Sequence, residues 1–287
     1  MLDGFREERI DTSGATIAVS IGGKGPPLLL LHGFPQTRVM WHRIAPALAE
    51  RYTVVCPDLR GYGASSKPPG GIDHGGYAKR AMALDQVETM RRLGFERFQV
   101  VGHDRGGRVT HRLCLDWPDA VERACVIDIA PTLTMYERTD KAFATAYYHW
   151  FFLIQPEPLP ERLIGADSDW YVERMLGSWG GGYFDPRAVA AYQAAFRDPA
   201  TLHAGCEDYR AAASIDLDHD RADAQKRIAC PLLVLWGSRG VVARSYDVLA
   251  TWREKAGDVR GHAIEGGHFL PEEKPDETLA ALRGFLA

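Results

Sequence analysis

The chain has 287 residues, of which 46% are hydrophobic, and this is enough to bury the core of one large domain with an insertion. The formal net charge is −4, from 34 basic and 38 acidic residues, with no basic stripe suited to nucleic acid or an anionic membrane surface. The composition therefore excludes a general polyanion binder, and any recognition of an anion must be local.

Two further features predict the compartment. The five cysteines are odd in number, have no CxxC spacing and lie mostly in apolar runs, as expected for reduced thiols in a core. The N-terminal segment carries charged residues where a signal peptide is apolar, and no apolar run is as long as a membrane-spanning helix needs. We therefore expect a soluble, cytoplasmic protein.

The apolar pattern predicts a sheet. Residues from about Phe5 to Ile21 alternate like a hairpin around a turn at 12–14, at the edge of the sheet. Short apolar runs then alternate with helix-length segments, as in buried parallel strands joined by right-handed crossovers. These runs lie at residues 27–31, 53–56, 98–101, 124–127 and 232–236. The pattern predicts a mostly parallel, doubly wound α/β sheet.

An aspartate follows the run at 98–101, within Gly102-His103-Asp104-Arg105-Gly106-Gly107. The glycines permit a sharp turn from strand to helix, which is how the α/β-hydrolase fold presents its nucleophile. A mere helix cap at Asp104 is the alternative, but a cap needs none of these glycines. Serine attacking a saturated carbon would leave a stable ether, whereas aspartate leaves an ester that water can cleave. Asp104 therefore predicts nucleophilic attack on an sp³ carbon.

The alternation of strands and helices stops between roughly Leu133 and Ala213. This segment is predicted to form several helices, broken by prolines at 156, 158 and 160 and by the glycine run 180–182. It holds more than half of the chain's aromatic residues, which suits a cap over a small pocket, although packing of cap on core explains part of the excess. We predict a core of residues 1–132 and 214–287 and a helical cap of residues 133–213.

His268 is the predicted general base, because it lies in Glu265-Gly266-Gly267-His268-Phe269, after a candidate last strand. The acid that orients it is less obvious, since residues 236–240 contain no carboxylate. Asp128, which ends the run at 124–127, is the candidate to hold the imidazole tautomer. The simpler interpretation is that Asp128 only caps a loop.

Two kinds of anion contact are predicted beside Asp104. The loop His32-Gly33-Phe34-Pro35 follows the run at 27–31, so the N–H groups of Phe34 and Arg105 are the candidate oxyanion donors. Arg105 and Arg108 share one face of the following helix and could hold a small carboxylate. Ion pairing of these arginines to carboxylates of the cap is the alternative.

These motifs, together with Asp128 and the cap segments Tyr148-His149-Trp150 and Asp208-Tyr209-Arg210, resemble the fluoroacetate (haloacetate) dehalogenases over essentially the full length. The resemblance implies that Arg105 and Arg108 bind the substrate carboxylate and that the departing halide is bound by His149, Trp150 and Tyr209. It also implies a homodimer. The loop at 32–35 is less specific, since epoxide hydrolases share it. Aromatic core packing is the alternative for Trp150 and Tyr209.

The sequence thus predicts a hydrolase that converts haloacetate and water to glycolate and halide through an ester on Asp104. No metal and no organic cofactor are expected, and the partner is a small haloacid rather than nucleic acid or membrane. An epoxide hydrolase is the alternative enzyme, with a tyrosine among Tyr147, Tyr148 and Tyr209 as its acid. A hydrolase-fold receptor for a small acid is the alternative that has no catalytic activity.

Overall fold

The computed structural model describes residues 1–181 and 183–287, so Gly182 of the predicted glycine run lies outside the described residues. Its centre is an eight-stranded sheet in the order β1-β2-β4-β3-β5-β6-β7-β8. The strands are β1 (Arg6–Asp11), β2 (Thr16–Gly22), β3 (Pro27–Leu31), β4 (Thr53–Pro57), β5 (Phe98–His103), β6 (Val121–Ile127), β7 (Leu232–Gly237) and β8 (Val259–Ile264).

The predicted hairpin is confirmed. Strands β1 and β2 are antiparallel, with Arg6 opposite Ile21 and Asp11 opposite Thr16. The turn closes where the main-chain N–H of Thr12 donates to the carbonyl oxygen of Ala15 at 2.7 Å. Strand β2 is antiparallel to β4, and every later pairing in the sheet is parallel. The mostly parallel sheet follows from the continuous apolar runs, because both faces of such strands are buried.

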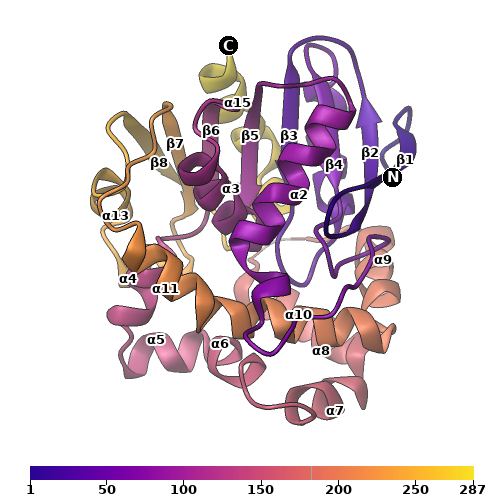
Figure 1. The fold of residues 1–287 in the computed structure, drawn as a ribbon, viewed down its shortest axis with the longest axis vertical. Helices are drawn as coiled ribbons and strands as arrows, with labels where there is room; N and C mark the ends of the chain where they lie inside the picture. Colours follow the sequence, from indigo (N-terminus) through magenta and orange to yellow (C-terminus); the bar gives the residue numbers. More distant parts are fainter. Residues whose placement is uncertain (182) are drawn as a thin grey trace.

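Helices cover both faces of the sheet. Figure 1 shows α2 (Lys79–Arg92) and α3 (Arg105–Asp116) in front of it and α15 (Pro275–Leu286) behind. The shorter helices of this part are η1 (Arg38–Arg43), α1 (Ala45–Leu48), η2 (Gly75–Tyr77), α12 (Val241–Ser245), α13 (Val248–Arg253) and α14 (Leu270–Glu273). No helix among the described residues is both long enough and apolar enough to cross a membrane.

The segment between β6 and β7 is helical, as predicted, and Figure 1 shows helices α5 to α10 gathered below the sheet. Its helices are α4 (Thr132–Glu137), α5 (Lys141–Ala146), α6 (Tyr148–Leu153), α7 (Leu159–Gly165), α8 (Ser168–Trp179), α9 (Pro186–Phe196), α10 (Pro199–Ala212) and α11 (Ile215–Ala222). Pro160 does not break a helix but lies in the first turn of α7, where its missing N–H costs nothing. The cap boundaries of 133 and 213 stay a prediction.

The chain reverses its direction of winding at β3. It passes from β3 to β4 on one side and then returns to β5 on the other. The loops that leave β3 and β5 therefore diverge, and such a switch point opens a crevice at the carboxyl ends of the strands. Phe34 follows β3 and Asp104 follows β5, so the fold brings these two sequence motifs together.

Candidate active site

Asp104 occupies a strained turn between β5 and α3. Its φ is 45° and its ψ is −113°, a backbone conformation that residues other than glycine rarely adopt. Close packing forces this turn, because a Cβ atom at Gly106 would lie 2.3 Å from the carbonyl oxygen of Leu31. The Asp104 side chain makes no capping hydrogen bond to α3, so the helix-cap alternative is wrong. The turn instead presents the carboxylate beyond the end of the sheet.

The loop after β3 contacts this carboxylate directly. The main-chain N–H of Phe34 donates to Oδ2 of Asp104 at 2.9 Å. A Cβ atom at Gly33 would lie 2.5 Å from Cβ of Asp104, so only glycine fits there. The N–H of Arg105 lies in the first turn of α3, where N–H groups have no intrahelical partner. The two predicted oxyanion donors thus lie on the two segments that meet at Asp104.

Asp104 is an ionised, buried nucleophile candidate. Burial alone would raise the pKa of its carboxyl, but nearby positive charges, foremost that of His268 and then those of Arg105 and Arg108, outweigh burial and hold the pKa below its usual value. The side chain is only 7% exposed, so few water molecules can solvate the charge. A carboxylate that is charged and poorly hydrated is a stronger nucleophile than one in open water.

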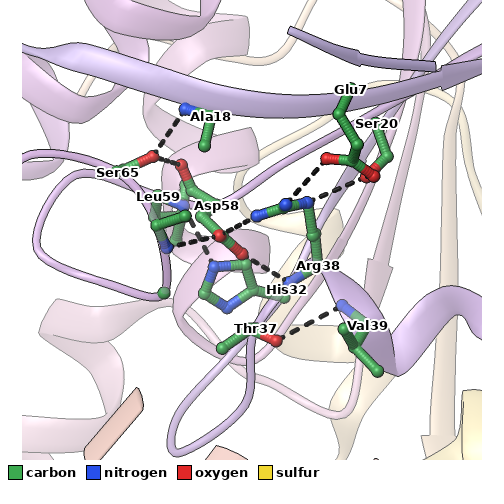
Figure 2. Close-up of polar contacts among 12 residues, drawn as sticks. Glu7, Ala18, Ser20, His32, Thr37, Arg38, Val39, Asp58, Leu59 and Ser65 are labelled. Atoms are coloured by element: carbon green, nitrogen blue, oxygen red, sulfur yellow. Dashed lines mark hydrogen bonds and ion pairs between the residues drawn. The ribbon is translucent and has the colours of Figure 1, made fainter. Parts of the chain in front are cut away.

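A buried polar cluster supports the loop after β3, and Figure 2 shows it around Asp58 and Arg38. His32 accepts a hydrogen bond at Nε2 from the N–H of Leu59 at 3.0 Å and donates from Nδ1 to the carbonyl oxygen of Gly33 at 3.0 Å. Burial lowers the pKa of His32, which keeps the ring neutral in this tautomer. Asp58 accepts from the N–H of Arg38 at 2.8 Å. The cluster therefore fixes Gly33 immediately before the donor of Phe34.

His268 and Asp128 form the predicted pair. Nδ1 of His268 donates to Oδ2 of Asp128 at 2.5 Å. Burial would lower the pKa of His268, but the hydrogen bond and the charge of Asp128 raise it overall. Oδ1 of Asp128 accepts from the N–H of Gly237 at 2.9 Å, so the last residue of β7, whose following loop lacks a carboxylate, binds this one. Asp128 does hold a loop, as the simpler interpretation expected, and it also holds the histidine.

His103 fixes the loop that carries His268, a role that the sequence did not indicate. Its Nε2 donates to the carbonyl oxygen of His268 at 2.9 Å, and the two ring centroids lie 4.6 Å apart. Burial lowers the pKa of His103 to about 3, so this ring is neutral beside Asp104. The N–H of His268 donates to the carbonyl oxygen of Trp179 at 2.9 Å, which links the base to α8.

The two arginines have different environments. Arg105 is paired with Asp208 of α10, through Nε at 2.9 Å and Nη2 at 2.7 Å. Arg108 donates to the carbonyl oxygen of Ala130 at 3.2 Å and to the hydroxyl of Thr132 at 3.0 Å, but it pairs with no carboxylate among the described residues. The alternative of pairing to the cap therefore applies to Arg105 and not to Arg108. Burial of an arginine charge without a carboxylate partner costs free energy of desolvation, and an anionic ligand that pairs with the arginine would offset this cost.

The three halide-binding candidates lie together next to the arginines. The ring centroid of Tyr209 is 5.6 Å from that of His149 and 6.5 Å from that of Trp150. The guanidinium of Arg108 lies 4.6 Å from the Trp150 ring, and that of Arg105 lies 4.1 Å from the Tyr209 ring. These contacts also make the aromatic rings part of the packing. The packing alternative for Trp150 and Tyr209 is therefore confirmed, and binding of a halide by these two residues stays a prediction.

Tyr209 and His149 are both neutral and can each donate a hydrogen bond. Burial raises the pKa of Tyr209 well above its usual value, so its hydroxyl remains a donor. Burial lowers the pKa of His149 well below its usual value, so its imidazole is neutral and carries one N–H. Nδ1 of His149 has no hydrogen-bond partner in the described part of the chain. The group can therefore donate to a small anion without adding a charge.

A cavity of about 120 Å³ reaches His268 from the surface. Its wall includes Tyr147, Trp179, Arg239 and Arg244. Tyr147 is buried, whereas Tyr148 is 41% exposed and therefore does not face the site. Apart from the many aromatic residues of the segment, no sequence pattern indicated Trp179. The sequence analysis also predicted no role for Asp208, although Asp208 directly precedes Tyr209.

Comparison with known proteins agrees with this geometry. Residues 26–275 match the family model of the alpha/beta hydrolase fold. The whole chain is 49% identical to a fluoroacetate dehalogenase from Burkholderia sp, covering 95% of that protein. It is 35% identical to a soluble epoxide hydrolase from Corynebacterium sp. strain C12, over 92% of this chain and 91% of that one.

Solved structures agree as well. A protein from Pseudomonas aeruginosa, provisionally named an epoxide hydrolase, is 50% identical, with a TM-score of 0.94 over 100% of this chain and 97% of its own; a mutant of it was solved with bound MFA. A protein from Nostoc sp PCC 7120, provisionally named an alpha/beta hydrolase, is 57% identical, with a TM-score of 0.99 over 100% and 99% of the two chains. The chain therefore belongs to the alpha/beta hydrolase family, among the relatives of fluoroacetate dehalogenase.

Proposed function

We propose that this protein is a haloacetate dehalogenase that converts a 2-haloacetate and water to glycolate and halide through an aspartyl ester on Asp104. Two features of one site carry the proposal. The nucleophile turn holds an ionised carboxylate, Asp104, and near it lies a buried arginine, Arg108, that has no carboxylate partner among the described residues. The nucleophile suits a saturated carbon, and the arginine suits a substrate that brings its own carboxylate.

In the first step, the carboxylate of Asp104 attacks the α-carbon of the haloacetate. Phe34 holds Oδ2, so Oδ1 is the attacking atom. A bond forms between Oδ1 and the α-carbon while the carbon–halogen bond breaks, and the electron pair leaves with the halide. Arg108 and Nη1 of Arg105, which has no partner among the described residues, hold the substrate carboxylate, and this orients the α-carbon for in-line attack.

The departing halide needs donors, and fluoride needs them most because its charge is compact. The indole N–H of Trp150, the hydroxyl of Tyr209 and the imidazole N–H of His149 would supply them. If each contributes about 1.5–3 kcal/mol, the three together lower the barrier by at most roughly 5–9 kcal/mol. At about 1.36 kcal/mol per decade, this corresponds to roughly four to seven decades of rate.

In the second step, His268 takes a proton from a water molecule that attacks the carbonyl carbon of the ester. Negative charge develops on Oδ2 of Asp104, where the N–H groups of Phe34 and Arg105 would stabilise it. The bond between the carbonyl carbon and Oδ1 then breaks, so glycolate leaves with the enzyme's oxygen and the carboxylate retains the oxygen of water. Asp128 stabilises the imidazolium that forms on His268. The imidazolium then gives its proton to the departing oxygen of glycolate, and the new carboxyl group of Asp104 releases its proton to solvent.

Three further parts of the proposal rest on the family resemblance and the sequence. Residues 133–213 act as a cap over the pocket, the protein is a homodimer, and it works in the cytoplasm. Size-exclusion chromatography with light scattering tests the dimer, and a mass of one chain would contradict it.

An epoxide hydrolase is the second candidate, because buried Tyr147 and Tyr209 both adjoin the site and the epoxide hydrolase from Corynebacterium is 35% identical. A neutral epoxide would, however, leave Arg108 buried without a partner. The experiment that decides is turnover of fluoroacetate, chloroacetate, bromoacetate and styrene oxide side by side, with halide measured by ion chromatography. Halide release without diol formation supports the dehalogenase, and diol formation alone contradicts it.

A further inference from the structure

Asp208 is a fully buried carboxylate of α10 to which the reaction described above gives no part. Its Oδ1 accepts a hydrogen bond from Nη2 of Arg105 at 2.7 Å and forms an ion pair with Nζ of Lys79. Its Oδ2 accepts from Nε of Arg105 at 2.9 Å and from the hydroxyl of Tyr62 at 2.7 Å. Asp208 therefore connects one cap helix to three separate segments of the core.

These contacts use up most of the donors of Arg105. A guanidinium has five N–H groups, one on Nε and two on each terminal nitrogen. The N–H of Nε and both N–H groups of Nη2 are directed to Asp208, since Nη2 also donates to the main-chain oxygen of Asp208 at 2.8 Å. Nη1 has no partner among the residues that the structure describes. Arg105 can thus offer a ligand one nitrogen, in an orientation that Asp208 fixes.

The same contacts set the charge of the pocket. Two buried cations, Arg105 and Lys79, are balanced by Asp208 and by Asp216, whose Oδ2 lies 3.4 Å from Nζ of Lys79. Arg108 is the buried cation next to Asp104 that has no carboxylate partner within the described ranges. One arginine, rather than two, therefore has a guanidinium that no carboxylate of the described residues contacts directly.

We propose that Asp208 makes the pocket selective for ligands with a single negative charge, because it neutralises Arg105 and leaves Arg108 alone to balance the ligand. This inference rests on the proposed function in one respect, that the pocket beside Arg108 binds a carboxylate. A 2-haloacetate or glycolate carries one charge and is matched. A dicarboxylate such as oxalate carries two, and its second charge would lie unpaired beside the carboxylate of Asp104, which is unfavourable in a buried site.

The test compares glycolate with oxalate, two acids of similar size and different charge, in titration calorimetry on the intact protein. The wild-type protein is expected to bind glycolate more tightly. In Asp208→Asn the ratio of the two dissociation constants should shift toward oxalate by at least about tenfold, because one buried negative charge is lost. In Lys79→Met it should shift in the opposite direction. The double variant Lys79→Met/Asp208→Asn should return to within about threefold of the wild-type ratio, because both charges are removed.

The set of variants separates charge from folding. If Asp208→Asn does not fold, two measurements still test the inference. They are the shift of the ratio of dissociation constants in Lys79→Met and the reversal of that shift in the double variant. Asp85→Asn is the matched control, since Asp85 is also buried and also holds a buried arginine, Arg60, by Nε at 2.5 Å. The ratio of the glycolate and oxalate dissociation constants in Asp85→Asn should equal that of the wild type. Equal ratios in all variants, or a wild type that prefers oxalate, would overturn the inference. Calorimetry needs no turnover, so a protein that releases no halide contradicts the proposed function and leaves the charge test intact.

Discussion

Nδ1 of His268 lies 2.5 Å from Oδ2 of Asp128, although Asp128 follows β6 and His268 follows β8. Strand β7 lies between these two strands in the sheet, and its Gly237 donates to the other carboxylate oxygen of Asp128 at 2.9 Å. The acid, the base and the intervening loop therefore form one unit across three neighbouring strand ends. Substitution of Asp128 should therefore change the pKa of His268.

Asp128→Asn should lower the pKa of His268, because the two largest effects that raise it against burial, a hydrogen bond and a charge, come from Asp128. The acid limb of the pH profile of kcat should move to lower pH, and kcat at its plateau should fall by at least about a hundredfold, because the amide favours the wrong tautomer. Halide release in steady state, measured from pH 5 to 9, checks both effects. A lower kcat with an unmoved acid limb would contradict the role of Asp128.

The wild-type pH dependence has a definite sign. His268 must be neutral to accept a proton from water, and its pKa is raised above the ordinary 6.5, so kcat should increase with pH through a midpoint above 6.5. The charged pair with Asp128 stabilises the fold, and this stabilisation is fully present below pH 6.5 and lost as the pH rises through the folded-state pKa. Chemical denaturation of the wild type and of His268→Gln at several pH values measures the difference, which should shrink toward alkaline pH.

His268→Gln should also stop the reaction after its first step. The ester on Asp104 needs an activated water for hydrolysis, and removal of the base leaves the attack on the haloacetate intact. Intact-protein mass spectrometry after incubation with chloroacetate should show one added carboxymethyl group, and peptide mapping should assign it to Asp104. A single turnover of the wild type in heavy-oxygen water should instead leave the label in Asp104 and not in glycolate. Label that appears only in glycolate would exclude the ester.

The variants Arg105→Met and Arg108→Met should differ in their free energy of unfolding. Arg105→Met would leave Asp208 buried with one of its cations removed, so we expect a loss of about 3–5 kcal/mol in the free energy of unfolding. Arg108→Met strands no carboxylate among the described residues and should be close to neutral. Both variants should show a KM for chloroacetate at least about tenfold higher, since each loses a donor to the substrate. Thermal unfolding and steady-state kinetics check the pair, and equal stability losses would contradict the assignment.

The sequence predicted those parts of the site that depend on local chain geometry. Asp104, Asp128 and Phe34 each follow a continuous apolar run, and the ends of buried parallel strands meet at one edge of a sheet. The partners of Arg105 could not be predicted in this way. Asp208 lies 103 positions from Arg105 in the chain, and Lys79 lies 129 positions from Asp208. Nothing in the spacing of such residues indicates that the fold buries them together.

The helical cap was predicted as a segment but not as individual helices. Its helices are short, and α6 carries the run Tyr148-His149-Trp150 followed by two phenylalanines, which gives no clean polar face. Periodicity therefore cannot separate the ligand side of α6 from its packing side. The structure distinguishes them, because Trp150 is 1% exposed whereas Tyr148 is 41% exposed.

The halide donors should matter most for the poorest leaving group. Tyr209→Phe and Trp150→Phe each remove one donor while keeping an aromatic side chain, so each should slow defluorination of fluoroacetate by about 10- to 150-fold. Bromoacetate should be affected far less, because bromide is larger and needs less stabilisation as it leaves. Tyr148→Phe is the matched control on the exposed side of α6. A uniform loss across the halides would indicate damage to packing and not to halide binding.

Gly33 and Gly177 offer a test of the close approach at the nucleophile. A methyl group at Gly33 would lie 2.5 Å from Cβ of Asp104, whereas one at Gly177 of α8 has no neighbour within 4 Å. Gly33→Ala must therefore displace either Phe34 or Asp104, and we expect kcat to fall by about a hundredfold or more as the oxyanion donor moves. Gly177→Ala should keep full activity and raise the free energy of unfolding by up to about 1 kcal/mol, because alanine favours the helix. Halide release and chemical denaturation of both variants measure the contrast. Full activity in Gly33→Ala would mean that the contact between Phe34 and Asp104 does not contribute to catalysis.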